Sequence, residues 1–292
     1  MIFIGIDSGT QSTKALALDA ETGEILASSQ EAYDILGGLP NGHMEQDPGN
    51  WINAVRNVIG SCVDALGERK LEIKGIGVSG QQHGLVVLDE NDDVIRPAKL
   101  WCDTSTVDQC QQFTRDFEGD AGLIELTGNT VLPGYTVPKI LWMKQKEADN
   151  FAKIKTVLLP HDYINFWLTG VKRMEYGDAS GTGMLDVRKR EWCDQIIDYV
   201  DPVLREMLPP LGSSLEPHGQ LRSALIDEWG LAGGVIVSAG GGDNMMGAIG
   251  TGNVKTGTIT ASFGTSGTLY GFSDKPAIDG GGEVAAFCDS TD

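Results

Sequence analysis

Basic residues are scarce in this sequence. Its 292 residues include 22 Lys and Arg against 41 Asp and Glu, which gives a formal net charge of −19. Nucleic acids and anionic membrane surfaces bind basic patches, so this balance argues against both as partners. An anionic ligand must instead be held by local devices, such as backbone N–H groups, a helix N-terminus or a divalent cation.

Paired cysteines and long apolar runs are also missing. The five cysteines are odd in number and include no CxxC pair, which argues against a disulfide framework or a zinc site. No apolar stretch reaches the length of a membrane span, and the N-terminus lacks the basic and apolar regions of a signal peptide. These absences predict a soluble cytoplasmic protein with reduced thiols.

Two catalytic motifs are absent as well. There is no GxxxxGK[ST] stretch, which argues against a P-loop kinase, and no GxSxG elbow, which argues against an α/β-hydrolase. What is present is an ordinary globular composition, 41% hydrophobic and 22% charged. The length favours two lobes, or one lobe with part of another.

The first hundred residues predict strands followed by one long helix. Three strands joined by short turns indicate an antiparallel meander over residues 2–7, 13–19 and 24–33, the first of them a buried strand. Asp47 is an expected N-cap with Pro48 at the first helical position. The helix that follows, to about residue 68, has an apolar stripe formed by Trp51, Val55, Val58, Cys62 and Leu66.

The rest of the chain changes character several times. We expect a short strand over residues 74–80 and a hairpin over 85–101 around an acidic turn. From about 105 to 230 the pattern is mostly helical, with helix candidates at 135–154 and 225–233. A buried strand, three glycines and a helix start then follow, with a strand–turn–strand after them. This pattern places a domain boundary that divides the chain into residues 1–248 and 249–292.

Two stretches place Gly, Thr and Ser in a tight turn between apolar strands, "IDSGTQSTK" at 6–14 and "SFGTSGT" at 262–268. Glycine lets backbone amides approach an anion, and the hydroxyl groups add donors, so these turns suit phosphate oxygens. Either turn alone would also suit an ordinary hairpin. Asp7 cannot contact phosphate favourably, so we expect it to hold Mg²⁺, through water, with Lys14 adding a compensating charge.

Two further stretches carry polar side chains at the ends of predicted strands. In "GGGDN" three glycines clear space beside Asp243, whose carboxylate could accept a proton from a substrate hydroxyl. The alternative is that Asp243 or Asn244 caps the following helix. In "GQQHG", Gln82 and His83 offer neutral donors and acceptors of the kind that a polyol needs. The other three histidines, which include His161, are expected to be structural.

Taken together and in this order, these stretches resemble the FGGY carbohydrate kinases. The resemblance extends over nearly the whole chain and includes "GIDSGTQSTK", "MEQDPGNW", "GVSGQQHG", "RPAKLWCDTS", "LLPHDYINFWLTG", "GDASGTGMLDVRKREW" and "GGGDNMMGAIGTG". It implies an α/β chain with the actin-like ATPase (ribonuclease H-like) fold, consisting of the N-terminal lobe and the beginning of a second lobe.

The resemblance also implies a reaction, the transfer of a phosphoryl group from MgATP to a ketose. The acceptor expected first is the 5-hydroxyl of D-xylulose. Asp243 resembles the family's catalytic base, and Asp7 resembles the acid that organises Mg²⁺ and the phosphates. The implied sugar-binding residues are Gln82, His83, Asp243, Asn244 and Asp103, and the implied ATP-binding residues are Gly9, Thr10, Gln11, Ser12, Lys14, Gly264, Thr265 and Ser266.

The sequence departs from the family in two places. Gln82 stands where Met is common, which loosens the substrate assignment, and the residues after Asp103 differ from the common "DGR". Family members continue past residue 292 into the lobe that binds adenosine, so the chain alone is expected to be inactive. Three alternative functions stay open: a ribulose or fuculose kinase, an ATPase of the actin and Hsp70 type, and a sugar-binding fragment. A homodimer also stays open.

Overall fold

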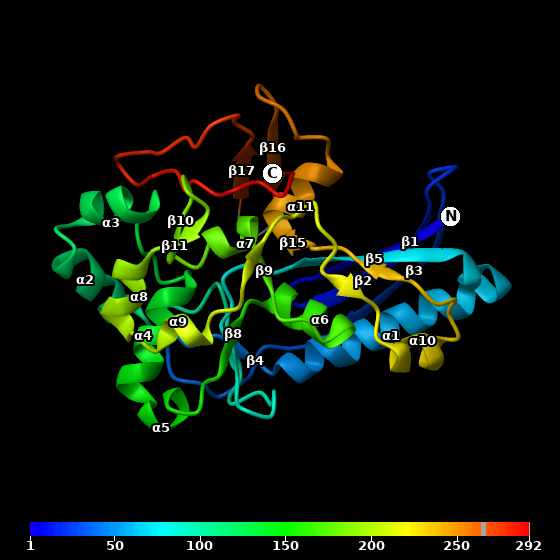
Figure 1. The fold of residues 1–292 in the computed structure, drawn as a ribbon, viewed down its shortest axis with the longest axis horizontal. Coiled ribbons are helices and arrows are strands. Elements are labelled where there is room, and N and C mark those ends of the chain that lie inside the picture. Colours follow the sequence, from blue (N-terminus) through cyan, green and yellow to red (C-terminus); the bar gives the residue numbers. More distant parts are fainter. Residues whose placement is uncertain (264–266, 292) are drawn as a thin grey trace.

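A mixed sheet of seven strands forms the centre of the computed structural model, which describes residues 1–263 and 267–291. The antiparallel meander predicted from the sequence is confirmed and consists of β1 (Ile2–Ser8), β2 (Ser12–Asp19) and β3 (Ile25–Ala32). On the far side of β1 lies β5, parallel to it, followed by β14 and β13 (Figure 1). The bounds of the remaining sheet strands are β5 (Ile73–Gly80), β13 (Gly219–Gln220), β14 (Ile236–Val237) and β15 (Gly241–Gly242).

The first strand is buried on one face only, not on both as expected. Ile2, Ile4 and Ile6 point into the core, whereas Phe3 and Asp7 are exposed on the opposite face. Side chains of a strand alternate between faces, so a polar residue is tolerated wherever the second face is open to solvent. The alternation therefore exposes Asp7 even though the strand itself is central.

Helix α1 (Pro48–Leu66) covers the buried face of the meander, below the sheet in Figure 1. The Asp47 side chain accepts a hydrogen bond from the Gly49 N–H at 2.8 Å, which confirms the expected N-cap. All five residues of the predicted stripe are buried in the core. Two further helices complete this layer, α6 (Pro160–Thr169) and α10 (Ser223–Trp229).

A second hydrophobic core lies in the helical half of the molecule, on the left of Figure 1. The helix predicted over 135–154 is broken in two at Glu147, whose backbone leaves the helical region at φ −133° and ψ 53°. The helices here are α2 (Val107–Asp116), α3 (Asp120–Thr127), α4 (Thr136–Lys146), α5 (Ala148–Phe151), α8 (Asp194–Val200) and α9 (Leu204–Met207). Helix α7 (Tyr176–Ser180) packs in a third, smaller hydrophobic cluster.

Short strands and one 3₁₀ helix also lie outside the central sheet, some of them in the region predicted to be mostly helical. Most of these strands pair with a distant segment, which local sequence patterns do not reveal, whereas β10 and β11 pair with each other across a short turn. The 3₁₀ helix is η1 (Gly67–Glu72). The strands are β4 (Glu45–Gln46), β8 (Thr156–Leu158), β9 (Met174–Glu175), β10 (Leu185–Asp186), β11 (Glu191–Trp192) and β12 (Leu211–Gly212).

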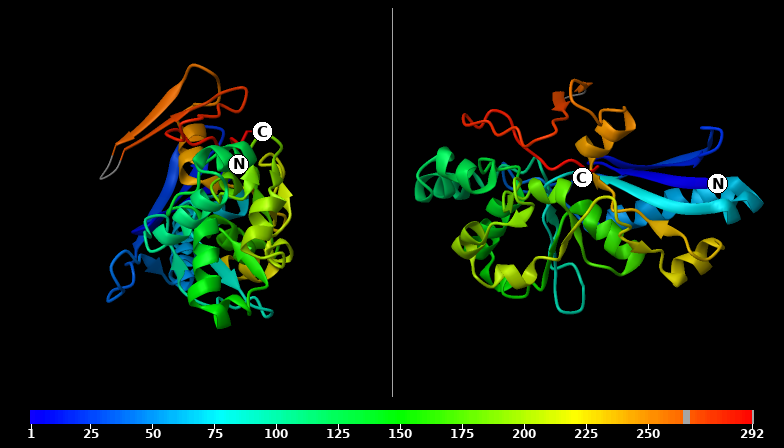
Figure 2. Two further views of the ribbon diagram at one scale, coloured as in Figure 1. Left: turned by 90° about the vertical axis from the view of Figure 1, so that its left-hand side faces the viewer. Right: turned by 45° about the horizontal axis from the view of Figure 1, so that its top comes forward.

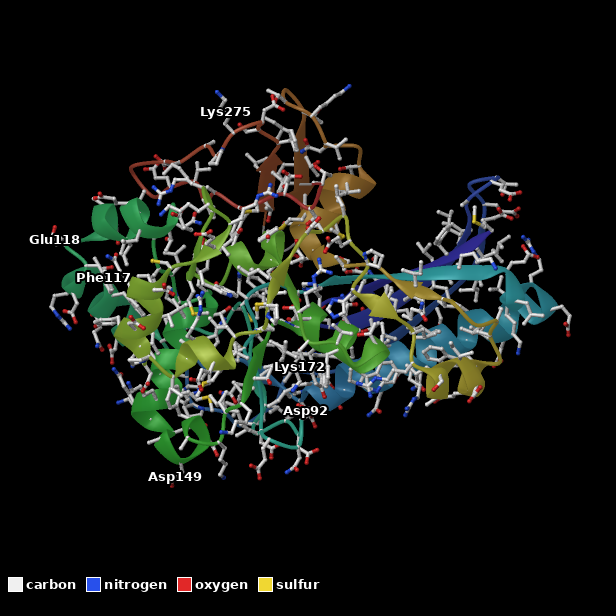
Figure 3. All side chains as sticks on the ribbon, viewed as in Figure 1. Asp92, Phe117, Glu118, Asp149, Lys172 and Lys275 are labelled. Carbon is white, nitrogen blue, oxygen red and sulfur yellow. The ribbon has the colours of Figure 1, made fainter. Side chains whose placement is uncertain are left out.

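The hairpin expected over residues 85–101 is only partly formed. Isolated antiparallel bridges join its two arms at Leu85 with Lys99 and at Leu88 with Val94. The strands within the arms pair elsewhere, β6 (Val86–Leu88) with β8 and β7 (Ala98–Lys99) with β4. Asp92 in the turn forms an ion pair with Lys172, and both side chains are labelled in the lower half of Figure 3. The two arms are therefore bridged to each other at two points, and each also pairs with another part of the chain.

Helix α11 (Asp243–Gly250) leads from the sheet to a hairpin formed by β16 (Ile259–Phe263) and β17 (Gly267–Gly271). The hairpin projects from the rest of the fold (Figure 2). The chain then returns to the first lobe, where Ala286 exchanges two hydrogen bonds with the Asn129 side chain. The boundary between 248 and 249 stays a prediction. In the part of the chain described, no helix is both long and apolar enough to cross a membrane.

Candidate active site

Three parallel strands end side by side at one edge of the sheet. Strand β5 lies in the middle, where Ser79 is in register with Asp7 of β1 on one side and with Gly241 of β15 on the other. The residues that follow β5 and β15 therefore emerge next to the end of β1. The carboxyl edge of a parallel sheet is where ligands bind in open α/β folds, because loops diverge there and leave a crevice.

A cleft of about 740 Å³ opens at this edge. One side is formed by the strand ends and the start of α11, and the other by side chains of the β16–β17 hairpin. Its lining residues are Asp7, Gly9, Ser79, Gln82, His83, Trp101, Asp243, Asn244, Met246, Gly247, Thr260, Ser262, Phe263, Thr268 and Tyr270. Six residues predicted from the sequence thus line one cleft, although 236 positions separate Asp7 from Asp243. They are Asp7, Gly9, Gln82, His83, Asp243 and Asn244.

Asp243 is the first residue of α11, and its carboxylate opens into the cleft. The N-cap of the helix is Gly242, so the alternative that Asp243 or Asn244 caps it is not what the structure has. The walls of the cleft desolvate the carboxylate, and the negative charges of Asp178 and Asp7 add to this effect. Together they raise the pKa of Asp243 to about 6.

Asn244 connects Asp243 to Gln82. Its Nδ2 donates to Gln82 Oε1 at 2.7 Å and lies 3.2 Å from Asp243 Oδ1. Glycine is required beside this group, because a Cβ on Gly242 would lie 2.6 Å from the Cγ of Gln82. The glycine run thus lets β15 approach the buried Gln82 side chain closely, and the polar groups of the three residues are held together.

His83 has an unusual backbone and a closely packed ring. Its φ is 63°, in the left-handed region that few non-glycine residues adopt. The ring lies 5.0 Å from the ring of Tyr135 and 6.0 Å from that of Phe287. Burial of the ring lowers the pKa of His83 to about 4, assisted by the charge of Lys139 and opposed by that of Asp178. The imidazole is therefore neutral near neutral pH and can donate one hydrogen bond and accept another.

The turn between β1 and β2 is held by side chains that bind its carbonyl groups. Tyr33 Oη donates to the Gly9 carbonyl at 2.7 Å, and Gln46 Nε2 donates to the Thr10 carbonyl at 2.6 Å. The N–H groups of Thr10 and Gln11 have no hydrogen-bond partner within the residues described. Free N–H groups in a fixed turn suit an anionic oxygen.

Asp7 fits a divalent cation. Its carboxylate is exposed at the cleft and has no hydrogen-bond or ion-pair partner among residues 1–263 and 267–291. Carboxylate oxygens and water are the ligands that Mg²⁺ prefers, and a cation would also relieve the repulsion between Asp7 and Asp243. Lys14 is the register partner of Asp7 on β2, on the same face of the sheet, where its charge offsets that of Asp7.

Asp103 is not brought to the cleft. Its carboxylate is fully buried and accepts hydrogen bonds from the Met44 N–H, from Ser105 and from Lys99. Ligand atoms of His43, Glu45 and Asp103 lie close enough to suggest a metal site. The Nζ of Lys99 contacts all three, at 3.3, 3.0 and 3.1 Å, so the protein supplies its own cation there.

The second predicted phosphate turn, Gly264, Thr265 and Ser266, lies outside the described residues. Phe263 and Thr268 on either side of it line the cleft. In the first turn Gly9 lines the cleft, and Thr10 Oγ1 accepts a hydrogen bond from Trp101, itself a lining residue. Gln11, Ser12 and Lys14 belong to or follow the same turn but are not among the lining residues.

Sequence reasoning missed the side chains that hold the first turn. Gln81 belongs to the same "GQQHG" stretch as the predicted pair, but it accepts a hydrogen bond from Thr10 Oγ1 and contacts Gln46. Adjacent residues of an extended chain point to opposite sides, and this alternation was the signal that could have separated Gln81 from Gln82. Tyr33 and Gln46 carried no such signal.

Below the site lies a buried charged cluster. His161 Nδ1 lies 2.6 Å from Asp178 Oδ2, and both side chains are fully buried. Burial disfavours the charged ring, but the carboxylates of Asp162, Asp178 and Glu175 outweigh it and raise the pKa of His161 to about 10. His161 does not line the cleft, and its structural role stays a prediction, whereas the charge of Asp178 affects the pKa of both His83 and Asp243.

Residues 2–250 match the family model for the N-terminal domain of the FGGY family of carbohydrate kinases. A xylulose kinase of Haemophilus influenzae is 43% identical over 298 aligned residues, covering 99% of this chain and 60% of that protein. A xylulose kinase of Bacillus subtilis is 37% identical, covering 97% of this chain and 56% of that protein.

A solved structure of a xyloylose kinase from Brucella ovis superposes with a TM-score of 0.93 at 37% identity, covering 99% of this chain and 58% of that one. The chain thus spans somewhat more than half the length of these relatives. The predicted mixed α/β, actin-like fold is confirmed by this superposition. The chain belongs to the FGGY family of carbohydrate kinases.

Proposed function

We propose that the full-length protein transfers the γ-phosphoryl group of ATP to the 5-hydroxyl of D-xylulose, giving D-xylulose 5-phosphate. The observation that carries this proposal is that Asp7 and Asp243 face one cleft, together with Gly9 of the turn and with Gln82 and His83. The xylulose kinases similar to this chain support the choice of sugar.

Asp243 is the proposed general base. Its raised pKa lies close to neutral pH, so the carboxylate is mostly ionised yet basic enough to take a proton from the sugar hydroxyl. The proton moves to the Asp243 carboxylate as the hydroxyl oxygen forms its bond to the γ-phosphorus, while the bond from that phosphorus to the bridging oxygen breaks and ADP leaves. General-base assistance of this kind contributes about 10²- to 10⁴-fold.

The proposed sugar-binding residues remain Gln82, His83, Asn244 and Asp103, but Asp103 differs from the other three because it does not line the cleft. The neutral His83 ring and the linked amides of Gln82 and Asn244 can pair with several hydroxyl groups. Asp103 is separated from the cleft, so any effect of it on the sugar must pass through other residues.

The first turn is the proposed phosphate site. Free N–H groups of Thr10 and Gln11, with the hydroxyl of Ser12, would bind phosphate oxygens, and Gly264–Ser266 would form the second half of the site. Asp7 would hold Mg²⁺ through water, and the ion would neutralise charge on the transferring phosphoryl group. Lys14 offsets the charge of Asp7 from the next strand.

Sugar-dependent release of ADP tests the proposal in the full-length protein. We expect ADP formation to require a ketose, to be fastest with D-xylulose, and to yield a phosphate ester at C5 that NMR can locate. Faster turnover of D-ribulose or L-fuculose would reassign the substrate within the family. ADP release that is independent of any sugar would favour an ATPase of the actin type and would overturn the proposal.

Two further properties follow from the proposal. A kinase that uses MgATP works where that nucleotide is present, so we place the protein in the cytoplasm. A homodimer is left open, and light scattering on the full-length protein decides it.

A further inference from the structure

Lys139, in the first turns of α4, is buried completely without an acidic partner. Its Nζ donates to the carbonyl of Gly134 at 2.6 Å and to the carbonyl of His83 at 2.8 Å. Within the residues described, no carboxylate lies at ion-pair distance from this Nζ. The other fully buried lysine, Lys99, has two carboxylates in contact.

Burying an ammonium group without a counter-charge is unfavourable. Burial accordingly lowers the pKa of Lys139 to about 7, with the more distant Asp103 opposing the shift. An uncharged residue of similar shape would avoid this penalty, so the presence of lysine needs a reason. The two carbonyl groups that it binds are the only candidates that the described residues offer.

One of these carbonyl groups belongs to His83, the residue with left-handed backbone. Such a conformation is strained for a non-glycine residue, so it persists only where the surroundings hold it. The His83 carbonyl accepts a second hydrogen bond from Thr136 Oγ1 at 3.2 Å. Both donors come from one turn of α4, so this helix end fixes the peptide that carries the imidazole.

The ring of His83 is held by the same segment. Tyr135 directly precedes Thr136 and packs on the imidazole, while a Cβ on Gly181 would lie 2.2 Å from the His83 Nδ1. The ring thus has little freedom once the backbone is set. Lys139 itself does not line the cleft, so any effect on substrate must pass through His83.

We propose that Lys139 is a positioning residue for the sugar site, which holds the strained His83 peptide through its carbonyl so that the imidazole faces the cleft. The proposal rests on the proposed function for its substrate, a ketose, and deepens it by naming a residue that sets sugar affinity without touching the sugar. Thr136 assists at the same carbonyl.

The test uses Lys139→Met in the full-length protein, with Lys144→Met as the matched control on the same helix. Lys144 is partly exposed and pairs with Asp201. We expect Lys139→Met to raise the KM for ketose by about 10- to 100-fold, the effect of removing a hydrogen-bond donor from the buried His83 carbonyl. kcat should change by less than about 3-fold, since the reacting groups remain in place. Lys144→Met should leave both constants unchanged.

A double-mutant cycle separates positioning from general destabilisation. In a His83→Ala background Lys139→Met should raise KM by less than about 2-fold, because the ring through which it acts is gone. An equal rise in both backgrounds, or an unchanged KM in the single variant, would overturn the role of Lys139. If Lys139→Met fails to fold, Thr136→Val replaces it in the same cycle and must show the same dependence on His83.

The wild-type assay distinguishes failure of this inference from failure of the proposed function. A wild-type protein that phosphorylates no ketose refutes the proposed function. If the wild-type protein phosphorylates a ketose but Lys139→Met and Thr136→Val have the same KM for ketose as wild type, only the role of Lys139 is refuted.

Discussion

The two sides of the cleft are built in different ways. On the side of Asp243, side chains provide the polar groups, and glycines at 241 and 242 and hydrogen bonds between side chains fix their positions. On the side of Asp7, a backbone turn provides them, and its carbonyl groups are bound by the side chains of Tyr33 just after β3, Gln46 in β4 and Gln81 just after β5. One sugar differs from another in the placement of its hydroxyl groups, whereas the phosphate groups of different nucleotides are the same.

This difference suits the proposed division of substrates. Side chains can be exchanged to read a particular pattern of hydroxyls, and loss of one contact leaves its buried partner unpaired. Backbone N–H groups cannot be exchanged and bind any phosphate oxygen that reaches them. Variants on the Asp243 side should therefore change ketose binding or turnover, whereas variants on the Asp7 side should change the requirement for Mg²⁺ or ATP.

The largest effect is expected from Asp243→Asn. The amide has the same shape but cannot accept a proton, so kcat should fall by about 10²- to 10⁴-fold. Calorimetry should still detect ketose binding, because Gln82 and His83 remain. Asp149→Asn on the surface of α5 (Figure 3) is the control and should be unaffected. Near-normal turnover in Asp243→Asn would remove Asp243 from its proposed role.

The next largest effect is expected from Asp7→Asn, which should change the requirement for Mg²⁺ on the ATP side of the cleft rather than the binding of ketose. Loss of the carboxylate should raise the Mg²⁺ concentration needed for half-maximal activity by about 10- to 100-fold, typical of losing an outer-shell partner of a metal. The dissociation constant for ketose should not change. If sugar affinity fell while the Mg²⁺ requirement stayed constant, the assignment of the two sides would have to be reversed.

A smaller effect is expected from Gly242→Ala. The new methyl group would displace Gln82, and overpacking of this kind costs about 1–3 kcal/mol. We expect KM for ketose to rise while the KM for ATP is constant. Gly233→Ala, where a Cβ meets open space, is the matched control for both KM and Tm. Equal changes in both KM values would show that the two sides are not independent.

Much of the fold could be predicted, because its signals are local. The meander and α1 follow from alternation, from the Asp47 cap and from helical spacing. The pairing of β6 with β8 and the break at Glu147 could not be predicted, since both depend on contacts between distant segments.

The site shows the same division. The site residues Asp7, Gln82, His83 and Asp243 were recognisable because each lies at or just after the end of a strand, and adjacent parallel strands end at one edge. Lys139 carried no such signal. Its sequence position is that of any lysine in a helix, and only the structure reveals that its side chain is buried against the His83 carbonyl.

The pH dependence of kcat/KM for D-xylulose tests the central claim most directly. Protonation of Asp243 removes the base, so with a pKa of about 6 activity should be full above this pH and fall tenfold per pH unit below it. The residual activity of Asp243→Asn should lack this acid limb. A variant that retained both the limb and near-normal turnover would contradict the claim that this carboxylate takes the proton from the sugar.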